Sequence, residues 1–198
     1  MVAVANSSTA TFADLLMRAQ APTQAQLAAH LDALDVDQRV TQCRALNKRA
    51  QKRLWEICAD AAAFTLEDLI PSTETGTVRW AGKNSLALFT HFEKRFARQN
   101  GVVVGYNFNP GVAWFTGPGY FTTVQAPDRP REILFDYTRV PSTPPEGWPP
   151  VKANTGGTAK LVYGGMHDFC RRVSSTVIIG AATRLGKPID AYFVLART

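Results

Sequence analysis

Two adjacent arginines, Arg171 and Arg172, stand in an otherwise largely apolar stretch of this 198-residue chain. Successive side chains of a β-strand point to opposite faces, so one of the two arginines is expected to face inward. A buried guanidinium is costly unless an anionic group neutralises it. Arg171 shares its face with Phe169, and Asp136 is its natural structural partner, while a ligand carboxylate or phosphate is the functional alternative. Arg95 is a further cation that could serve the same site.

Aromatic side chains are the second group that could bind a ligand. The chain has 11 Phe, 5 Tyr and 4 Trp, most of them after residue 76. Apolar walls with a few polar groups are typical of small-molecule pockets, whereas the interior of an eight-stranded barrel is often filled by side chains. A cavity and a filled core therefore both stay open. The aromatic residues expected to line a cavity are Tyr106, Trp114, Tyr120, Tyr137 and Tyr163.

The sequence contains no motif of a metal or cofactor site. The segments His91–Glu93 and His167–Asp168 combine His with an acid, but neither has the spacing that places three ligands around one ion. No phosphate-binding loop and no nucleophile elbow follows a predicted strand. We therefore predict no metal and no cofactor. An enzyme of the isomerase or cyclase type stays open as an alternative, with Asp136 or His91 as its general base.

Charge and composition narrow the class of protein. Lys and Arg outnumber Asp and Glu by 22 to 16, but the excess is not gathered in a tail and no specific nucleic-acid motif is present. The densest basic run, Arg44 to Arg53, is typical of a solvated helix face. Sparse cysteines predict a protein without disulfides. The sequence also shows no leader and no apolar run of about 20 residues, which predicts a cytoplasmic protein without a membrane span.

The first third of the chain has helical periodicity. Thr11 begins a capping box, which predicts a short helix after it, and a second helix is expected from Gln24 to Leu34. Apolar residues at steps of three or four predict a third and longer helix from Asp37 to about residue 62. Residues 1–72 are therefore assigned to a helical N-terminal region.

From about residue 76 the pattern changes to short strands separated by turns. No helical pattern lies between them, so the sheet should be antiparallel. Segment 85–96 suits a helical turn that leads into a strand. The Pro-rich run 140–157 is too long for a hairpin and is expected to cover one barrel end as a lid. The expected strands are 85–96, 101–108, 112–115, 120–124, 132–138, 159–164, 168–182 and 190–197.

Several short stretches are similar to one protein family. CRRVSSTVIIG (170–180) and YFVLAR (192–197) resemble the C-terminal strands of a bacterial lipocalin-like family of unknown function, named for a Gly-x-Trp-x-Gly motif. Lys94-Arg95-Phe96 resembles its Lys-Arg-Phe element. Trp80 and Gly82 match the motif itself, whereas Val78 stands where the first Gly belongs. The resemblance implies a lipocalin-like barrel and no particular reaction.

Together these patterns predict an α+β fold. The N-terminal helices should pack on an antiparallel, lipocalin-like β-barrel, or a strongly curled sheet, of about eight strands formed by residues 73–198. The first functional hypothesis is binding of a small, mainly apolar or amphiphilic ligand, with or without an anionic group, in the barrel. The enzyme is the second hypothesis. The third is a protein-interaction module in which the N-terminal helices dock a partner or close a homodimer.

Overall fold

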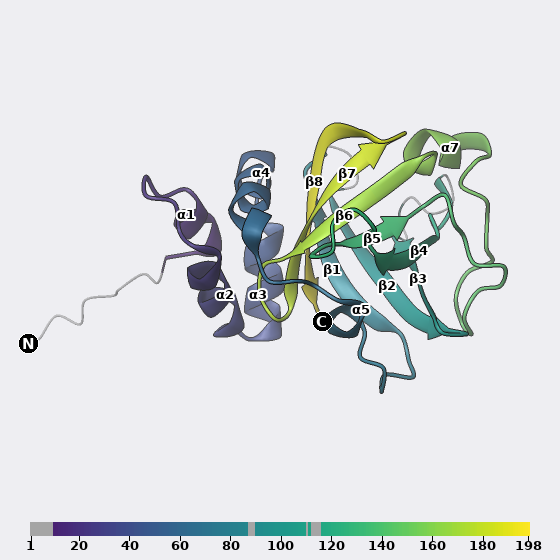
Figure 1. The fold of residues 1–198 in the computed structure, drawn as a ribbon, viewed down its shortest axis with the longest axis horizontal. Coiled ribbons are helices and arrows are strands. Elements are labelled where there is room, and N and C mark those ends of the chain that lie inside the picture. Colours follow the sequence, from purple (N-terminus) through teal and green to yellow (C-terminus); the bar gives the residue numbers. More distant parts are fainter. Residues whose placement is uncertain (1–9, 87–89, 110, 112–115) are drawn as a thin grey trace, which may run out of the picture.

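The computed structural model describes residues 10–86, 90–109, 111 and 116–198. Figure 1 shows two parts side by side, a group of helices from the first third of the chain and a β-barrel formed by the remainder. Within these described ranges, no helix combines the length and the apolarity that crossing a lipid bilayer requires.

Eight antiparallel strands form a closed barrel in which neighbours in sequence are neighbours in space. The barrel closes where β8 pairs with β1, with Ala196 opposite Ala81. Antiparallel neighbours need only short connections, which suits the turn-rich second half of the chain. The predicted antiparallel barrel of about eight strands is therefore confirmed. The strands are β1 (Val78–Asn84), β2 (His91–Gln99), β3 (Val102–Phe108), β4 (Phe121–Gln125), β5 (Ile133–Asp136), β6 (Met166–Arg172), β7 (Val177–Arg184) and β8 (Lys187–Arg197).

The single strand predicted over residues 168–182 is wrong, because this segment is the hairpin of β6 and β7. The backbone N–H of Val173 donates to the carbonyl of Val177 at 2.9 Å, which closes the turn. Inside the turn, the hydroxyl of Ser174 accepts from the backbone N–H of Thr176 at 3.2 Å. Small hydroxyl residues form such local bonds readily and therefore favour turns over continuous strands.

Two other expected strands differ from the structure or lie outside it, and one observed strand was not expected. Residues 159–164 belong to helix α7 (Gly157–Tyr163), where Ala, Lys and Leu are good helix formers. Conversely, β1 over residues 78–84 was not expected to be a strand. The expected strand 112–115 lies outside the described residues. The barrel therefore has the expected number of strands, although some of the individual assignments differ.

The helical third begins as predicted and then departs from the prediction. Helices α1 (Phe12–Leu16) and α2 (Gln24–Asp32) both start with a capping box. The single long helix expected over residues 37–62 is wrong, because it is two helices, α3 (Val36–Arg44) and α4 (Lys48–Ile57). The side chain of Asn47 accepts from the backbone N–H of Ala50 at 2.9 Å and so starts α4 anew. A 3₁₀ turn, η1 (Cys58–Asp60), and α5 (Leu66–Leu69) follow.

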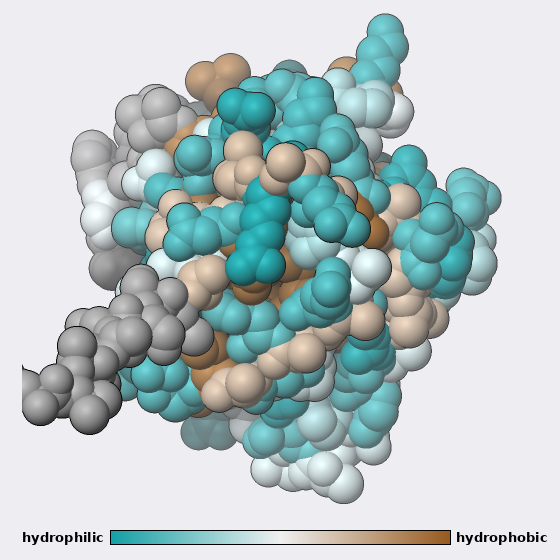
Figure 2. Space-filling view, turned by 90° about the vertical axis from the view of Figure 1, so that its left-hand side faces the viewer, coloured by the Kyte–Doolittle hydropathy of each residue, from teal (hydrophilic) through white to brown (hydrophobic). Residues whose placement is uncertain are grey.

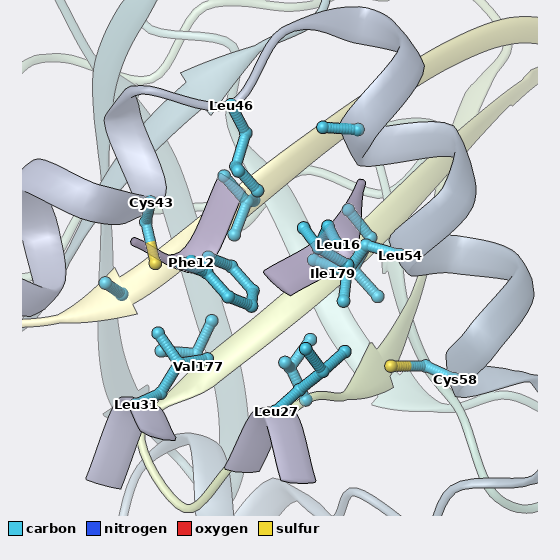
Figure 3. Close-up of a cluster of buried hydrophobic side chains, with 14 of the residues drawn as sticks. Phe12, Leu16, Leu27, Leu31, Cys43, Leu46, Leu54, Cys58, Val177 and Ile179 are labelled. Carbon is cyan, nitrogen blue, oxygen red and sulfur yellow. The ribbon is translucent and has the colours of Figure 1, made fainter. Parts of the chain in front are cut away.

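The helices bury their apolar faces against the outer surface of β7 and β8, as Figure 3 shows. Val177 and Ile179 of β7 and Val194 of β8 are fully buried in this cluster. The opposite surface of the helical layer is mostly hydrophilic (Figure 2). The apolar helix faces are thus occupied by the chain's own barrel. From the helices, the cluster contains Phe12, Leu16, Leu27, Leu31, Cys43, Leu46, Ala50, Leu54 and Cys58.

One end of the barrel is closed by the segment 61–70, which we call the plug. The indole N–H of Trp80 donates to the carbonyl of Leu69 at 3.3 Å, and the Trp80 ring packs edge-on against Phe64. Arg98 donates from its guanidinium to the carbonyl of Ile70. These contacts involve the start of β1 and the second half of β2, so the plug defines the lower end of the barrel in Figure 1.

Three glycines face phenylalanines directly across neighbouring strands. The register pairs Gly82 with Phe92, Gly105 with Phe121 and Gly180 with Phe193. In each pair the phenyl ring lies over the glycine so closely that a Cβ atom there would be 2.1–2.6 Å from ring carbons. Glycine is required at these positions because the ring occupies the space of its missing side chain. All three rings therefore lie flat along the inner wall.

The Pro-rich segment covers the side of the barrel, whereas it was expected to cover an end. The ring of Trp148 packs on Tyr106 with centroids 4.7 Å apart, and its indole N–H donates to the Thr77 hydroxyl at 2.9 Å. Asn154 donates to the carbonyl of Tyr120 at 2.7 Å. Only α7, which follows this segment, lies at an end of the barrel, at the upper right of Figure 1.

Candidate functional site

A cavity of about 460 Å³ opens at the barrel end opposite the plug. Its walls come from the end of β1, the start of β2, the end of β7 and the start of β8, together with α7. These are the strand ends that the plug does not reach. Most of the lining is apolar or aromatic, including Phe92, Val162, Tyr163, Met166, Tyr192 and Phe193.

The cavity contains a buried lysine, Lys94, at the centre of a polar cluster. Its side chain points inward from β2 and is 2% exposed. The ammonium group donates to the Tyr137 hydroxyl at 2.5 Å and to the Asn107 side-chain oxygen at 2.8 Å. It lies 3.5 Å from a carboxylate oxygen of Asp168, which comes from β6. Four strands, or residues directly after them, thus bring one polar group each to the same point.

Aromatic rings surround this ammonium group. Five ring centroids lie 4.7–5.5 Å from it. The negative face of an aromatic ring attracts a cation, and the attraction is stronger where water is excluded. Three of these rings, those of Phe92, Phe121 and Phe193, lie over the cross-strand glycines described above. The other two belong to Phe135 and Tyr137.

Burial shifts the proton affinities of the cluster. Desolvation lowers the pKa of Lys94, and the negative charge of Asp168 opposes that change. Desolvation raises the pKa of Asp168, and the positive charge of Lys94 opposes it. The pKa of Tyr137 is raised well above its usual value by burial and by the same carboxylate. The charged lysine and carboxylate therefore depend on each other for stability in this dry environment.

The Asp168 carboxylate is asymmetric in its contacts. One oxygen, Oδ2, faces Lys94 and accepts from the Tyr137 hydroxyl at 3.2 Å. The other, Oδ1, is buried and has no hydrogen-bond partner among the residues that the structure describes. A buried carboxylate with an unused acceptor is costly, which is typical of a functional site rather than of a filled core.

Two of the residues predicted to bind a ligand line the cavity. These are Tyr137 and Tyr163, whose rings stack with centroids 5.5 Å apart and planes 6° from parallel. The structure therefore brings this cavity-facing aromatic pair together from the residue after β5 and from the end of α7. Trp114, a third predicted aromatic, lies outside the described residues.

Arg95, Tyr106 and Tyr120 lie outside the cavity, on the outer face of the barrel. The Arg95 guanidinium pairs with Glu93 and donates to the Tyr106 hydroxyl at 3.3 Å. The Tyr120 hydroxyl donates to a carbonyl of the Pro-rich segment at 2.6 Å, and its ring lies beside Trp148. The two tyrosines are buried, but beneath the Pro-rich segment instead of within the barrel.

The structure also corrects the predicted positions of Arg171 and Asp136. The Arg171 guanidinium pairs with Glu132 at 2.8 Å and donates to the carbonyl of Trp55 in α4 at 2.8 Å. Asp136 instead contacts the ring of His167 at 3.1 Å. The expected Arg171–Asp136 pair is therefore wrong, and Arg171 fastens the helical layer to the barrel. Both side chains lie on the outer faces of their strands, one residue out of phase with the prediction.

The central residues of the cavity were missed although a signal for one of them exists. Phe92, Lys94 and Phe96 alternate along β2, so period-two geometry places the lysine on the aromatic face. Buried lysines are rare, so this alternation alone does not predict an inward lysine. Asp168 shares a face with Cys170 by the same alternation. No local pattern indicates that this carboxylate meets Lys94, because the two strands are not neighbours in the sheet.

The two residues proposed as general base of an enzyme do not lie in the cavity. His91 is exposed at the start of β2 and Asp136 points outward. Neither is among the residues that line the cavity. Among the residues that the structure describes, no group of three or more His, Cys, Asp and Glu side chains could hold a metal ion.

Comparison with known proteins adds no function to this geometry. No protein-family model, no curated protein and no solved structure matches the chain. The cavity and its polar cluster therefore carry the functional argument alone.

Proposed function

We propose that the protein binds a small, mainly apolar molecule inside the barrel, with one polar oxygen of that molecule at the Lys94 cluster. The observation that carries this proposal is an aromatic-walled cavity with a buried ion pair among its lining residues. A volume of about 460 Å³ lies within the range of roughly 300–1,000 Å³ that small-molecule sites occupy. Apolar walls with few polar groups are the usual composition of such sites.

The polar cluster favours a neutral head group over an anionic one. An ammonium group has three N–H donors, and those of Lys94 already face Asn107, Tyr137 and Asp168. A ligand carboxylate would have to displace one of these partners and would lie beside the Asp168 carboxylate. An alcohol carries no charge to repel this carboxylate, and its O–H can donate to Oδ1 of Asp168, the oxygen without a hydrogen-bond partner in the described part of the chain. The outward position of Arg171 removes the cation on which an anionic ligand was predicted to depend.

Binding is better supported than catalysis. The isomerase or cyclase hypothesis depended on Asp136 or His91 as general base, and neither lines the cavity. A base must reach the proton that it removes. The binding proposal needs only the cavity and its polar cluster.

A cavity-filling substitution tests the proposal. Ala182 lines the cavity from β7, while its neighbour Ala181 points to the outer face of the same strand. We expect the purified protein to bind the neutral fluorophore N-phenyl-1-naphthylamine. Ala182→Phe should weaken that binding by about tenfold or more, because the new ring occupies the space of the probe. The matched control Ala181→Phe should leave it unchanged.

Competition then tests the head group. Dodecanol should displace the fluorophore at lower concentration than dodecanoate, which has the same chain length and a carboxylate. Absence of probe binding, or equal loss of binding in both alanine variants, would show that the cavity is not the site. Stronger competition by dodecanoate would contradict the neutral head group while leaving the cavity as the site.

A further inference from the structure

Exposed apolar side chains concentrate at the mouth of the cavity. Among the described residues, seven large hydrophobic side chains are exposed, and four of them lie at this end of the barrel. Leu161 is 73% exposed and Leu185 is 81% exposed, the highest values of the seven. We call these four residues the apolar rim: Leu86, Leu161, Leu185 and Ile189.

The apolar rim is a continuous structure and not a set of scattered side chains. Leu185 donates its backbone N–H to the carbonyl of Gly165 at 2.9 Å, just after α7. Arg184 donates to the carbonyl of Leu161 at 3.0 Å, which joins the end of β7 to α7. Three of the four rim residues, Leu86, Leu161 and Ile189, also line the cavity. The rim therefore follows the cavity mouth along α7, β7, β8 and β1.

The stretches of chain that supply the rim residues also supply cations. Lys160 precedes Leu161 in α7, and Arg184 precedes Leu185 at the end of β7. Lys187 in β8 and Lys83 in β1 complete the set. None of the four forms an ion pair within the described part of the chain. We call these four residues the rim cations.

Acidic side chains are absent from the same stretches of sequence. Residues 83–92, 157–167 and 182–189 contain no Asp and no Glu. Asp190, which follows the last stretch, pairs with Lys48 of α4 at 2.8 Å. The cavity mouth therefore combines exposed aliphatic side chains with unneutralised positive charge.

We propose that the open end of the barrel docks on an anionic phospholipid surface. Leucine side chains gain free energy when they enter the boundary of a bilayer, and basic residues beside them are attracted by anionic head groups. A soluble surface rarely carries adjoining exposed leucines without a partner for them. Docking in this orientation places the cavity mouth against the lipid, so that an apolar ligand passes between the bilayer and the barrel without crossing water.

A second copy of the chain fits this surface poorly. Two rims that met face to face would bring the rim cations of both copies together, and like charges across an interface are strongly unfavourable. A lipid surface of opposite charge has no such conflict. The proposal goes beyond ligand binding, because docking depends on the rim and not on the contents of the cavity.

Vesicle co-sedimentation tests the docking. The full chain should bind vesicles made of two parts phosphatidylcholine and one part phosphatidylglycerol, and bind vesicles of phosphatidylcholine alone much more weakly. The double variant Lys160→Glu/Lys187→Glu should lower the partition coefficient by about tenfold or more. The double variant Leu161→Ser/Leu185→Ser should also lower it, because these exposed side chains contribute the apolar part of the interaction.

Matched variants elsewhere on the surface provide the controls. Arg49→Glu/Arg79→Glu makes the same change of net charge on α4 and at the plug end of β1, and Val36→Ser/Val102→Ser removes two exposed apolar side chains outside the rim. Both controls should bind vesicles like the parent chain. Equal losses in rim and control variants would show attraction by net charge alone and overturn the proposal. So would unchanged binding of the leucine variant, absence of binding, or a dimer in solution that either rim variant dissociates.

Discussion

Lys94 and Asp168 are the residues on which the barrel interior depends most. Their side chains are 2% and 5% exposed, so neither charge has bulk water to stabilise it. The hydrogen bonds from the lysine to Tyr137 and Asn107 satisfy its ammonium group, and the carboxylate receives the remaining contact. Removal of either charge therefore leaves the other buried without its counter-ion.

We expect Lys94→Met to lower the free energy of unfolding by about 3–5 kcal/mol, because Asp168 stays buried and unpaired. The double variant Lys94→Met/Asp168→Asn should be less destabilised than the single one, since it contains no isolated charge. Urea unfolding followed by tryptophan fluorescence measures both. If the free energy of unfolding of Lys94→Met lies within about 1 kcal/mol of the parent value, the pair contributes no more than an exposed ion pair does, and this result would contradict the buried ion pair.

For single residues, the sequence predicts which residue types fill the barrel better than it predicts which face of a strand each residue occupies. An aromatic-rich barrel interior was expected, and Tyr137 and Tyr163 do line the cavity. Tyr106 was placed inside because its strand alternates with bulky residues, but the Pro-rich segment buries the outer face of that strand as well. When both faces of a strand are covered, hydrophobic alternation does not identify the inner one.

The strands of the barrel depend on their cross-strand glycines. Gly180 lies under the ring of Phe193, and an added Cβ would come within 2.1 Å of a ring carbon. The same ring is one of those around the Lys94 ammonium group. A change at Gly180 therefore affects both the pairing of β7 with β8 and the wall of the cavity.

Gly180→Ala should destabilise the protein by about 1–3 kcal/mol or more, because the added methyl group forces the Phe193 ring from its position. Gly156→Ala is the matched control, since a Cβ there has no neighbour within 4 Å. Adding Phe193→Leu to the Gly180 variant should restore part of the stability by making room. Thermal unfolding measures all three, and equal melting temperatures for Gly180→Ala and Gly156→Ala would refute this explanation.

Element boundaries were predictable where a local cap or turn marks them. Thr11 begins a helix that the structure confirms, and the helix expected from Gln24 does start there, after the cap Thr23. Asn47 is an equally good cap, but it lies inside a continuous apolar stripe, so the periodicity concealed the break between α3 and α4. Residues 159–164 became a helix because a short apolar run has no period of its own, and the surrounding structure decides its conformation.

At the scale of the whole molecule, β7 and β8 belong to two cores at once. Val177 and Ile179 face the helical layer, while Ile178 and Leu195 face the barrel interior. Neither core can be exposed without disturbing the strands that the other needs. The predicted division into a helical region and a barrel therefore describes the order of the elements along the chain. The shared strands predict that both parts unfold together in one cooperative transition.

The three cysteines report on this cooperativity. All are free and buried, Cys43 and Cys58 in the helical core and Cys170 in the barrel core. Burial raises the pKa of Cys43 and of Cys58 to about 12, so both should be unreactive in the folded protein at neutral pH.

We expect all three thiols to become reactive over the same range of guanidinium concentration, because unfolding of either core opens the other. Pulse alkylation with iodoacetamide, followed by mass spectrometry of peptides, measures each thiol separately. Labelling of Cys43 and Cys58 at lower guanidinium than Cys170 would show instead that the helical layer unfolds as an independent domain.

The fold class was the most predictable feature. It depends on the helical period of apolar residues in the first third, on the strand period after it, and on the absence of helices between most strands. The closed barrel follows from eight short antiparallel strands, even though individual assignments were wrong. The cavity could not be predicted, since it depends on how side chains from non-adjacent strands meet. The position of the helical layer on β7 and β8 could not be predicted either, because the sequence of a helix does not indicate which strands its apolar face will cover.

The place of β8 has a consequence for biosynthesis. Helices α1 to α4 emerge from the ribosome before the strands of the barrel, yet the surface that they cover includes Val194 and Ala196 of β8. The same strand closes the barrel on β1. Until β8 is synthesised, the nascent chain exposes apolar helix faces and two unpaired sheet edges. Chaperones bind such surfaces, and the same surfaces promote aggregation. Pairing of β8 therefore covers the apolar helix faces and closes both sheet edges together.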